Sequence, residues 1–431
     1  MKIAKIEQQN FRGIKELTLE LDGKSTVIFG INGIGKSSIL RSIDLLYANI
    51  IGKLLNSSKR LAELSEEDIM AGKSRASVTG TFRFASGKEF EYYRSISKLG
   101  GKRHYKYLNN LIKYFEDEYI TKAYEDEDGN LVIAEDKKNM PVFVNYGVNR
   151  LVVDIPLKGA KQASYPKLST FDKAIESKLD FSALFEWFRI REDLENQEKV
   201  RSDMEHEDRD LGAVRTAMLA MLDDFDHIHI ERQPLMMVIE KEGVSLSLNQ
   251  LSDGEKCTLA LFGDLARRMA IANPSLANPL KGSGVVLIDE LELHMHTQWQ
   301  RKILRVLKET FPNIQFIVTT HSPQILGEAD QDYKIFTLKK EDGEISAYPY
   351  SSLFGWDSNV ILEELMGTGA LSRQIKDLSE KMFEAVEMSE FEAAEVLAAR
   401  IDELTGGRNN STTKARVQIA RGRRNEKNHK E

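Results

Sequence analysis

The eight residues from 30 to 37 constrain the fold of this 431-residue chain more than any other segment. They read Gly-Ile-Asn-Gly-Ile-Gly-Lys-Ser, with a short apolar run at 27–29 before them and a helical pattern at 38–55 after them. Glycines let backbone N–H groups converge on phosphate oxygens, and the N-terminus of the helix adds a partial positive charge. The pattern therefore predicts a strand, a phosphate-binding loop and a helix. The residues expected to bind a nucleotide are Gly30, Ile31, Asn32, Gly33, Ile34, Gly35, Lys36, Ser37 and Ser38.

A second segment supplies the carboxylates that such a loop needs for hydrolysis. Lys36 is expected to contact the β- and γ-phosphates of ATP, and Ser37 to ligate Mg²⁺. An apolar run at 285–288 ends in Asp289 and Glu290. Because ligands of α/β folds bind where parallel strands end, we expect Asp289 to hold the Mg²⁺ shell and Glu290 to orient or deprotonate the attacking water. A strand followed by an acidic helix cap is the structural alternative.

Histidines raise two further hypotheses. His321 follows the next apolar strand, in the run Thr-Thr-His-Ser-Pro at 319–323, and its position suits a catalytic residue that hydrogen-bonds the terminal phosphate. His294 and His296 have a spacing that zinc can use, but no third or fourth ligand is evident nearby. A zinc site is therefore not predicted.

The run Leu-Ser-Asp-Gly-Glu-Lys at 251–256, called the signature below, predicts a site shared between two copies of the chain. A hydroxyl and a glycine N–H at the start of a helix, here 255–271, can bind a γ-phosphate. We expect Ser252, Asp253, Gly254 and Glu255 to contact ATP held by a second copy of the chain. The alternative is a capping box, in which Ser252 and Glu255 satisfy each other's backbone N–H groups, and the two roles are compatible.

Together these motifs resemble the ABC-type ATPases of the SMC/RecF group. The resemblance implies an α/β, P-loop ATPase head with a mixed sheet, working as a head-to-head dimer with two composite ATP sites. The run Asn-Phe-Arg-Gly at 10–13 is similar to the N-terminal motif of that group, which implies that Arg12 approaches the nucleotide. The chain departs from the group after the strand at 141–145, where no glutamine is found and Asn145 is the candidate substitute at the metal.

The motifs and the pattern between them predict four regions. An N-terminal ATPase lobe at 1–170 contains the P-loop and an antiparallel hairpin, with a loop-rich insertion at 97–140. A helical arm is inserted at 171–227. A C-terminal ATPase lobe at 228–350 carries the signature, the Asp-Glu strand and the histidine loop. A helical extension at 351–431 has helices over 359–405 and ends in a basic tail, which is either a solvated terminus or a site for nucleic acid or a partner.

Composition narrows the class of protein. The net charge is −7, so bulk charge does not favour a polyanion binder, and no apolar run is long enough to span a bilayer. The N-terminus lacks the apolar segment of a signal peptide. A single cysteine, Cys257, suits a reducing compartment. We expect a cytoplasmic protein with no membrane contact.

A narrower resemblance concerns the phrasing around the signature, the Asp-Glu strand and the histidine loop, together with residues 353–366. These segments are similar to the PtuA family of ATPases from Septu and certain retron anti-phage systems. That family implies a homodimer or higher homo-oligomer that controls a separate HNH-type nuclease, PtuB, and in retrons a reverse transcriptase with its RNA and DNA. Asp330-Gln-Asp332 matches part of a TOPRIM metal motif, but no glycine-rich glutamate strand precedes it, so no nuclease activity of its own is expected.

Two other functions compete with this hypothesis. A RecF-type repair ATPase would clamp duplex DNA when it binds ATP, in a manner steeply dependent on salt. A transporter ATPase fits less well, because a helical segment at 172–226 stands in place of the usual membrane-coupling region.

Overall fold

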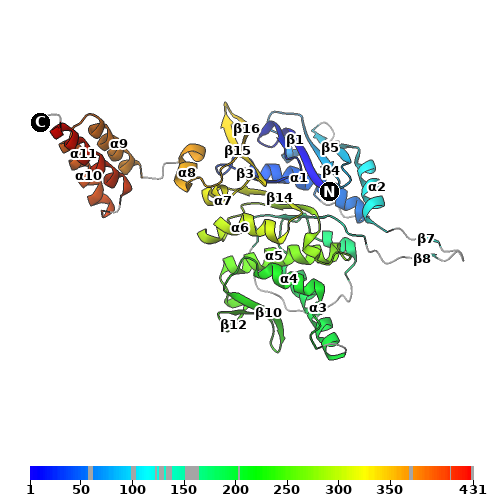
Figure 1. The fold of residues 1–431 in the computed structure, drawn as a ribbon. Coiled ribbons are helices and arrows are strands. Elements are labelled where there is room, and N and C mark those ends of the chain that lie inside the picture. Colours follow the sequence, from blue (N-terminus) through cyan, green and yellow to red (C-terminus); the bar gives the residue numbers. More distant parts are fainter. Residues whose placement is uncertain are drawn as a thin grey trace. The chain divides into compact units, whose positions relative to one another are not determined.

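The computed structural model describes residues 1–56, 62–98, 103–121, 124–125, 131–132, 138–150, 165–201, 204–367, 372–407 and 409–428. It divides into two compact units, Met1–Trp356 and Asp357–Glu431 (Figure 1). The first unit holds the sheets with their covering helices, and the second is helical.

The central sheet of the first unit has the strand order β16-β15-β3-β14-β13-β9. Neighbours from β15 to β9 run parallel, whereas β16 is antiparallel to β15. Every residue of β3, β9, β13 and β14 is buried, as expected for strands covered on both faces. The strands are β3 (Ser25–Phe29), β9 (Val142–Tyr146), β13 (Gly284–Ile288), β14 (Ile314–Thr320), β15 (Tyr333–Glu341) and β16 (Glu344–Tyr350). Because the parallel strands end at the same edge, the segments that follow β3, β9, β13 and β14 meet there, and the predicted α/β mixed sheet is confirmed.

A second, antiparallel sheet has the order β2-β1-β4-β5-β6. The P-loop helix α1 (Lys36–Leu54) contacts β1 and β4 of this sheet and β14 of the central sheet. The ring of Tyr47 on α1 stacks on Phe143 of β9, with centroids 3.6 Å apart, and meets Phe82 of β4 edge-on at 5.5 Å. The strands are β1 (Lys2–Phe11), β2 (Ile14–Glu20), β4 (Arg75–Arg83), β5 (Glu89–Ser97) and β6 (Arg103–Lys106). The helix that carries the P-loop is thus packed against both sheets.

The loop-rich prediction for 97–140 is wrong in part, because this segment contains the helix α2 (Leu108–Tyr119). Its buried side chains, Leu108, Leu111, Ile112, Phe115 and Tyr119, recur at helical spacing. That periodicity was present in the sequence and could have revealed the helix. The strand β6 (Arg103–Lys106) also lies in this segment, and the short strands β7 (Tyr124–Glu125) and β8 (Leu131–Val132) pair with each other. Residues 99–102, 122–123, 126–130 and 133–137 lie outside the described residues.

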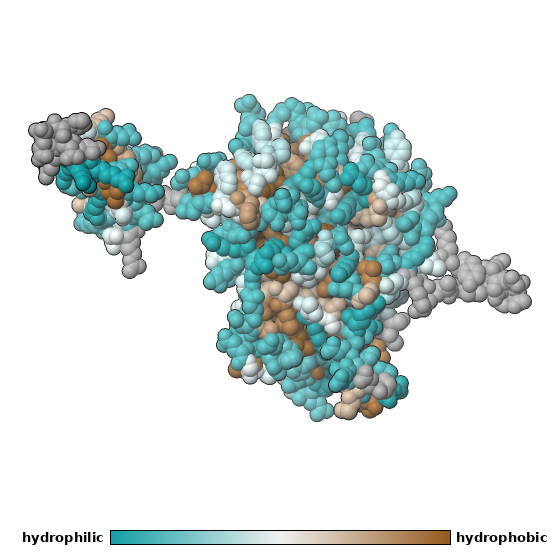
Figure 2. All heavy atoms as spheres, in the orientation of Figure 1, coloured by the Kyte–Doolittle hydropathy of each residue, from teal (hydrophilic) through white to brown (hydrophobic). Residues whose placement is uncertain are grey.

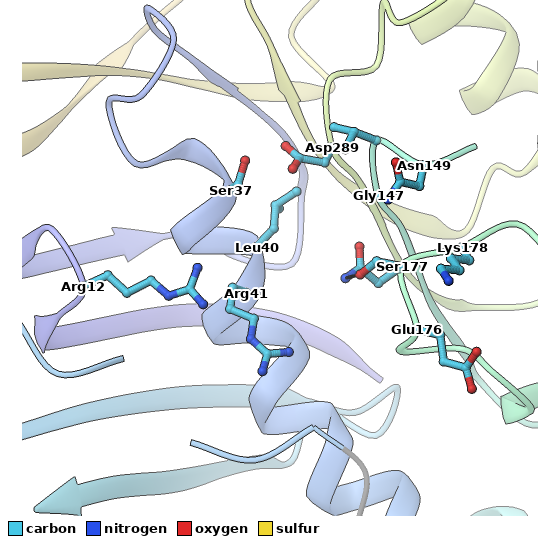
Figure 3. Close-up of a pocket in the computed structure, with 12 residues that line it drawn as sticks. Arg12, Ser37, Leu40, Arg41, Gly147, Asn149, Glu176, Ser177, Lys178 and Asp289 are labelled. Atoms are coloured by element: carbon cyan, nitrogen blue, oxygen red, sulfur yellow. Dashed lines mark hydrogen bonds between the residues drawn. The ribbon is translucent and has the colours of Figure 1, made fainter. Parts of the chain in front are cut away.

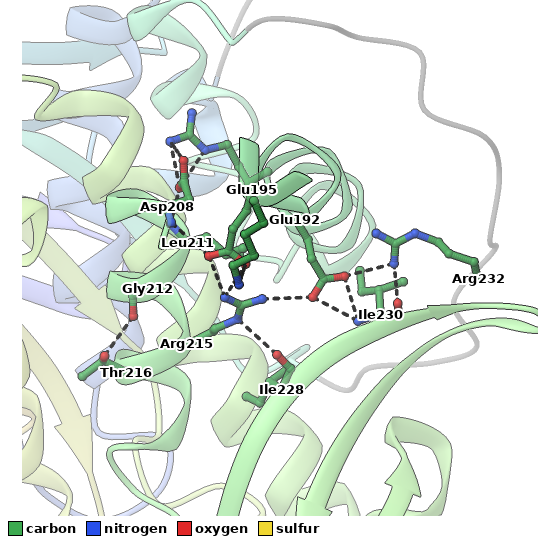
Figure 4. Close-up of polar contacts among 12 residues, drawn as sticks. Glu192, Glu195, Asp208, Leu211, Gly212, Arg215, Thr216, Ile228, Ile230 and Arg232 are labelled. Atoms are coloured by element: carbon green, nitrogen blue, oxygen red, sulfur yellow. Dashed lines mark hydrogen bonds and ion pairs between the residues drawn. The ribbon is translucent and has the colours of Figure 1, made fainter. Parts of the chain in front are cut away.

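The predicted arm at 171–227 contains the helices α3 (Phe181–Arg201) and α4 (Arg209–Leu219). A small sheet of order β10-β11-β12, most of which follows residue 227, packs against these two helices and is counted with the arm below. Arg215 of α4 pairs with Glu192 and Glu195 of α3, at 3.0 Å in each case (Figure 4). The Arg215 Nε donates to the Ile228 carbonyl, and the Glu192 carboxylate accepts from the Ile230 N–H. These two side chains therefore satisfy backbone groups on the open edge of β10. The strands are β10 (Phe225–Arg232), β11 (Leu235–Lys241) and β12 (Val244–Ser247).

The signature helix α5 (Asp253–Ala272) connects the arm to the head, because it packs against α3, α4 and β9. Asp264 on its buried face pairs with Arg267 at 2.6 Å and Arg268 at 2.8 Å, and accepts a hydrogen bond from the Tyr146 hydroxyl. The described residues of the first unit also form α6 (Thr297–Thr310), α7 (Pro323–Gly327) and the 3₁₀ turns Glu66–Asp68, Lys167–Phe171, Leu248–Gln250 and Pro279–Lys281.

The second unit contains α8 (Ser358–Met366), α9 (Arg373–Glu387), α10 (Phe391–Thr405) and α11 (Asn410–Asn428). Met382, Ala398 and Ile401 form a buried cluster with Ala415 of α11, and Phe391 packs near Ile419. The sequence predicted helix only as far as residue 405. Residues 410–428 are also helical, because the small and apolar side chains of α11 pack against α9 and α10.

The described helices include none that is both long and apolar enough to cross a bilayer. The face of the molecule in Figure 2 is mainly hydrophilic, with apolar residues scattered among the polar ones. Val200 and Met204 at the end of the arm are each 88% exposed.

Candidate nucleotide-binding site

The loop between β3 and α1 has the backbone of a phosphate-binding loop. Gly33 and Gly35 adopt positive φ values of 76° and 106°, which only glycine tolerates easily. Helix α1 begins at Lys36 without a side-chain cap, so its first N–H groups are open to an anion. A Cβ atom on Gly30 would come within 2.9 Å of the Ile34 side chain, so the loop closes only around glycine at this position. The strand, loop and helix predicted from the sequence are all present.

Lys36 is folded into its own loop. Its ammonium donates to the carbonyls of Gly30 at 2.7 Å and Ile31 at 3.1 Å, and the residue is buried. Burial lowers the pKa of Lys36, although the nearby carboxylates Glu292, Glu290 and Asp289 act in the opposite direction. A phosphate group would replace the two carbonyls as a charged and stronger acceptor.

The end of β13 is fixed by two residues that the sequence did not single out. The Thr319 hydroxyl donates to the Asp289 carboxylate and accepts from the Glu290 N–H at 2.8 Å. Arg150 donates to the carbonyls of Asp289 and Glu290, at 2.7 Å each. Glu290 itself has a φ of 48°. Within the described part of the chain, the Glu290 carboxylate has no hydrogen-bond partner and is free to orient a water molecule.

His321 follows β14 and lies against a third carboxylate. Its Nδ1 is 2.6 Å from Glu292 Oε1, and its backbone N–H donates to the same oxygen at 2.7 Å. The other oxygen of Glu292 accepts from the Thr320 hydroxyl. Glu292 is buried, whereas the His321 side chain is 43% exposed, so Glu292 anchors the histidine and leaves its ring accessible. No spacing rule distinguishes Glu292 from other acidic residues, and the sequence therefore did not reveal it.

Several predicted residues line one pocket of about 250 Å³ beside the start of α1 (Figure 3). Ser37 and Asp289 offer a hydroxyl and a carboxylate, the kind of oxygen ligands that Mg²⁺ takes in such ATPases, so the residues fit that metal. Arg12 also lines the pocket, with its Nε held by buried Asp68 at 2.8 Å. The complete lining is Arg12, Ser37, Leu40, Arg41, Asn145, Gly147, Val148, Asn149, Glu176, Ser177, Lys178 and Asp289.

Asn145 lies near the end of β9, in the wall of this pocket. Its Nδ2 donates to the Ser177 hydroxyl at 2.8 Å. On α1, burial raises the pKa of Asp44 to about 7, although Arg41 and the Asn145 side chain act to lower it. Asn145 is thus placed close to Ser37 and Asp289, while its role as a metal contact stays a prediction.

The signature residues do not line the pocket. Ser252 is the N-cap of α5: its side chain accepts from the Glu255 N–H, and the Glu255 carboxylate accepts from the Ser252 N–H, so the capping box is confirmed. Glu255 also pairs with Lys241 of β11 at 2.7 Å. A Cβ on Gly254 would lie 2.4 Å from the His294 carbonyl, so only glycine allows this approach of the signature to the loop after β13.

His294 and His296 belong to no cluster of three or more potential metal ligands in the part of the chain that the structure describes. His296 instead caps α6, where its Nδ1 accepts from the Gln298 N–H.

Comparisons with known proteins give two family matches. An AAA domain family covers residues 5–211, and the family "AAA domain, putative AbiEii toxin, Type IV TA system" covers residues 145–327. The Retron Ec83 probable ATPase of Escherichia coli is 28% identical, over 82% of this chain and 76% of that protein. The Retron Vc95 probable ATPase of Vibrio cholerae serotype O1 biovar El Tor is 29% identical, over 76% of this chain and 71% of that protein. Septu protein PtuA of Bacillus thuringiensis is 22% identical, over 85% of this chain and 84% of that protein.

Among solved structures, an Smc head bound to the C-winged helix domain of ScpA is similar with a TM-score of 0.49 and 17% identity, over 82% of this chain and 99% of that one. The strand order and the geometry of the P-loop fit the AAA domain families that match residues 5–211 and 145–327. Over most of its length, the chain is similar to the probable ATPases of retron systems and to Septu protein PtuA.

Proposed function

We propose that this ATPase hydrolyses ATP at sites shared between two copies of the chain, and that the ATP-dependent dimer regulates a partner nuclease in an anti-phage defence system. The observation that carries the shared site is the position of the signature. Ser252 is exposed at the N-terminus of a 20-residue helix, outside the pocket that Ser37 and Asp289 line. A helix N-terminus attracts phosphate. Because Ser252 lies outside the pocket of its own chain, the phosphate that it contacts would belong to ATP bound by a second copy.

Each residue of the proposed site has a separate task. Lys36 exchanges the carbonyls of its loop for the β- and γ-phosphates, and Ser37 and Asp289 hold Mg²⁺, which neutralises phosphate charge when bound. Glu290 accepts a proton from the attacking water, because its carboxylate has no competing partner among the described residues. His321, anchored by Glu292, donates to the terminal phosphate. Arg12 contributes a further positive charge at the pocket wall.

The proposed partner follows from the named relatives. Those proteins are called retron and Septu ATPases, and by analogy the chain would act with an HNH-type nuclease of the PtuB kind. A retron reverse transcriptase with its RNA and DNA is a further partner under the same analogy. We propose that the nuclease activity is supplied by that partner and that the complex works in the cytoplasm.

The test uses Glu290→Gln, which keeps the shape of the side chain and removes the base. With ATP and Mg²⁺ the variant should bind nucleotide, hydrolyse it about 100-fold or more slowly, and elute as a stable dimer in size-exclusion chromatography with light scattering. Lys36→Ala is the control and should not dimerise with ATP. A Glu290→Gln protein that binds ATP but stays monomeric would contradict the shared site.

A DNA-clamping function is the second candidate, and the surface of α11 favours it. Lys414, Arg421 and Arg424 are exposed and have no acidic partner in the described part of the chain, whereas Arg416 and Arg423 pair with α10. Phosphate contacts would make binding fall steeply with salt. Duplex DNA binding by the purified protein that requires ATP and weakens between 50 and 200 mM salt, as roughly expected for such contacts, would favour this candidate over nuclease regulation.

A further inference from the structure

We propose that Arg150 is a positioning residue for hydrolysis, because its guanidinium holds the backbone from which the Glu290 carboxylate reaches the attacking water. The proposal rests on the proposed ATPase function, in which Glu290 accepts a proton from that water. Arg150 does not line the pocket that Ser37 and Asp289 line, so its effect on the reaction passes through Glu290.

The direction of the Glu290 side chain depends on its backbone. The Asp289 carboxylate accepts a hydrogen bond from the Thr319 hydroxyl, whereas the Glu290 carboxylate has no such partner among the described residues. Glu290 has a φ of 48°, in the left-handed region that is unfavourable for a residue with a Cβ atom. Such a conformation persists only where neighbouring groups hold it. The groups that bond to this backbone therefore determine where the carboxylate points.

Arg150 and Thr319 together hold the two peptide groups on either side of the Glu290 Cα atom. The two terminal nitrogens of Arg150 donate to the carbonyls of Asp289 and Glu290, at 2.7 Å each. The N–H groups of the same two peptides, those of Glu290 and Leu291, donate to the Thr319 hydroxyl at 2.8 Å and to the Thr319 carbonyl at 2.9 Å. A guanidinium is planar and its donors have fixed directions, so its two bonds set the orientation of one peptide relative to the other.

The burial of Arg150 indicates a specific task. The residue is 3% exposed, and within the described part of the chain it forms no ion pair with a carboxylate. A buried arginine is rarely left without an acidic partner, because removing a charge from water is unfavourable. The Arg150 carbonyl accepts from the Cys257 thiol at 3.3 Å, so the residue is itself held against the signature helix α5. Arg150 thus connects α5 to the end of β13.

The experiment replaces Arg150 in two ways and measures kcat separately from ATP binding. Arg150→Lys keeps the charge but lacks the rigid pair of donors, and Arg150→Gln keeps amide donors and is easier to bury because it is neutral. Each variant should lower kcat by about 10- to 100-fold, the size expected when a reacting group is misplaced. The dissociation constant of ATP with Mg²⁺, measured by isothermal titration in the Glu290→Gln background, should stay within about twofold of that parent.

A double variant tests whether Arg150 acts through Glu290. Adding Arg150→Lys to Glu290→Gln should slow single-turnover hydrolysis by no more than about twofold, because the carboxylate that Arg150 positions is already absent. Equal slowing in the wild-type and Glu290→Gln backgrounds would show a general structural effect and overturn the positioning role. A kcat close to that of the wild type in both Arg150 variants would also overturn it.

Arg268→Lys is the matched control. Arg268 is fully buried and its guanidinium also donates to two backbone carbonyls, those of Thr170 and Asp172, away from the end of β13. The control should lower the free energy of unfolding in urea and leave kcat within about twofold of the wild type. A loss of kcat equal to that of Arg150→Lys would contradict the specific role of Arg150. Hydrolysis at the wild-type rate by Glu290→Gln would instead overturn the proposed function itself.

Discussion

The pocket beside the P-loop and the helical arm both bury charged side chains, but they satisfy these charges differently. In the arm, Arg215 is bonded to Glu192, Glu195 and the Ile228 carbonyl, and the two carboxylates also accept backbone N–H groups (Figure 4). In the pocket region, Lys36 bonds only to carbonyls of its own loop, and Asp44 Oδ1 and the Glu290 carboxylate have no partner among the described residues.

The difference separates structural charges from functional ones. Burial would raise the pKa of Glu195, but the Asp208 N–H and Arg215 outweigh burial and lower it, so the arm keeps its carboxylate ionised with internal partners. The pocket region instead retains polar groups whose hydrogen bonds a charged ligand could complete. Changes in the arm should therefore affect folding stability, and changes in the pocket should affect ATP binding and turnover.

The largest expected effect is in the pocket. Lys36→Ala should lower kcat/KM for ATP by about 1,000-fold, or about 4 kcal/mol of transition-state stabilisation, because no other described group replaces its charge in the loop. Its free energy of unfolding should stay close to that of the wild type, since only two bonds to loop carbonyls are lost. Steady-state kinetics measures kcat/KM, and urea unfolding measures the stability. A large loss of stability would contradict the distinction between functional charges in the pocket and structural charges in the arm.

A smaller effect is expected in the arm. Arg215→Ala should reduce the free energy of unfolding by about 2 to 3 kcal/mol, because the buried carboxylates Glu192 and Glu195 lose the cation they share and keep only Arg232 and Lys199, respectively. The dissociation constant for ATP should not change. Arg305→Ala removes an exposed pair with Glu309 and should cost less than about 0.5 kcal/mol. Equal effects of the two arginines in urea unfolding would contradict the structural role of the arm network.

The buried ion pairs of Asp264 with Arg267 and Arg268, all on α5, predict that the free energy of unfolding depends on pH. Burial alone would raise the pKa of Asp264, but Arg268 and Arg267 outweigh it and hold the pKa at about 2. Because this pKa lies below that of the unfolded chain, its stabilisation is complete above about pH 4 and is lost as the pH falls toward 2. The loss should amount to about 2 kcal/mol. Urea unfolding between pH 4.5 and about pH 2 measures it, and Asp264→Asn should remove this part of the slope.

Apart from the Arg305 control, the smallest expected effect on stability comes from changing Ser252, the N-cap of α5. Ser252→Ala should cost about 1 kcal/mol of stability through the lost N-cap of α5, and Ser252→Asp should retain that stability. Unfolding curves of the two variants provide the test. A neutral Ser252→Ala would show that the capping box adds little to the fold.

The sequence predicted most of the head, because its elements are carried by local patterns. The P-loop, the apolar strands that precede Asp289 and His321, and the start of α5 all have strong local signals, and the structure contains each of them. The partners that hold the site were not predictable in this way. Arg150, Glu292 and Thr319 act through contacts between distant segments, which no spacing in a single sequence reveals. Helix α2 was missed although its apolar residues recur at helical spacing.

The most direct test of the shared site mixes two inactive variants. Lys36→Ala lacks a working P-loop, and Ser252→Arg should bind ATP but block closure, so each alone should hydrolyse little ATP. In a mixed dimer, the intact P-loop of the Ser252→Arg copy faces the intact signature of the Lys36→Ala copy. We expect mixing to restore a clear fraction of wild-type hydrolysis, rising with the proportion of mixed dimers. No recovery from a mixture that demonstrably forms mixed dimers, or full activity of Ser252→Arg alone, would contradict the shared site.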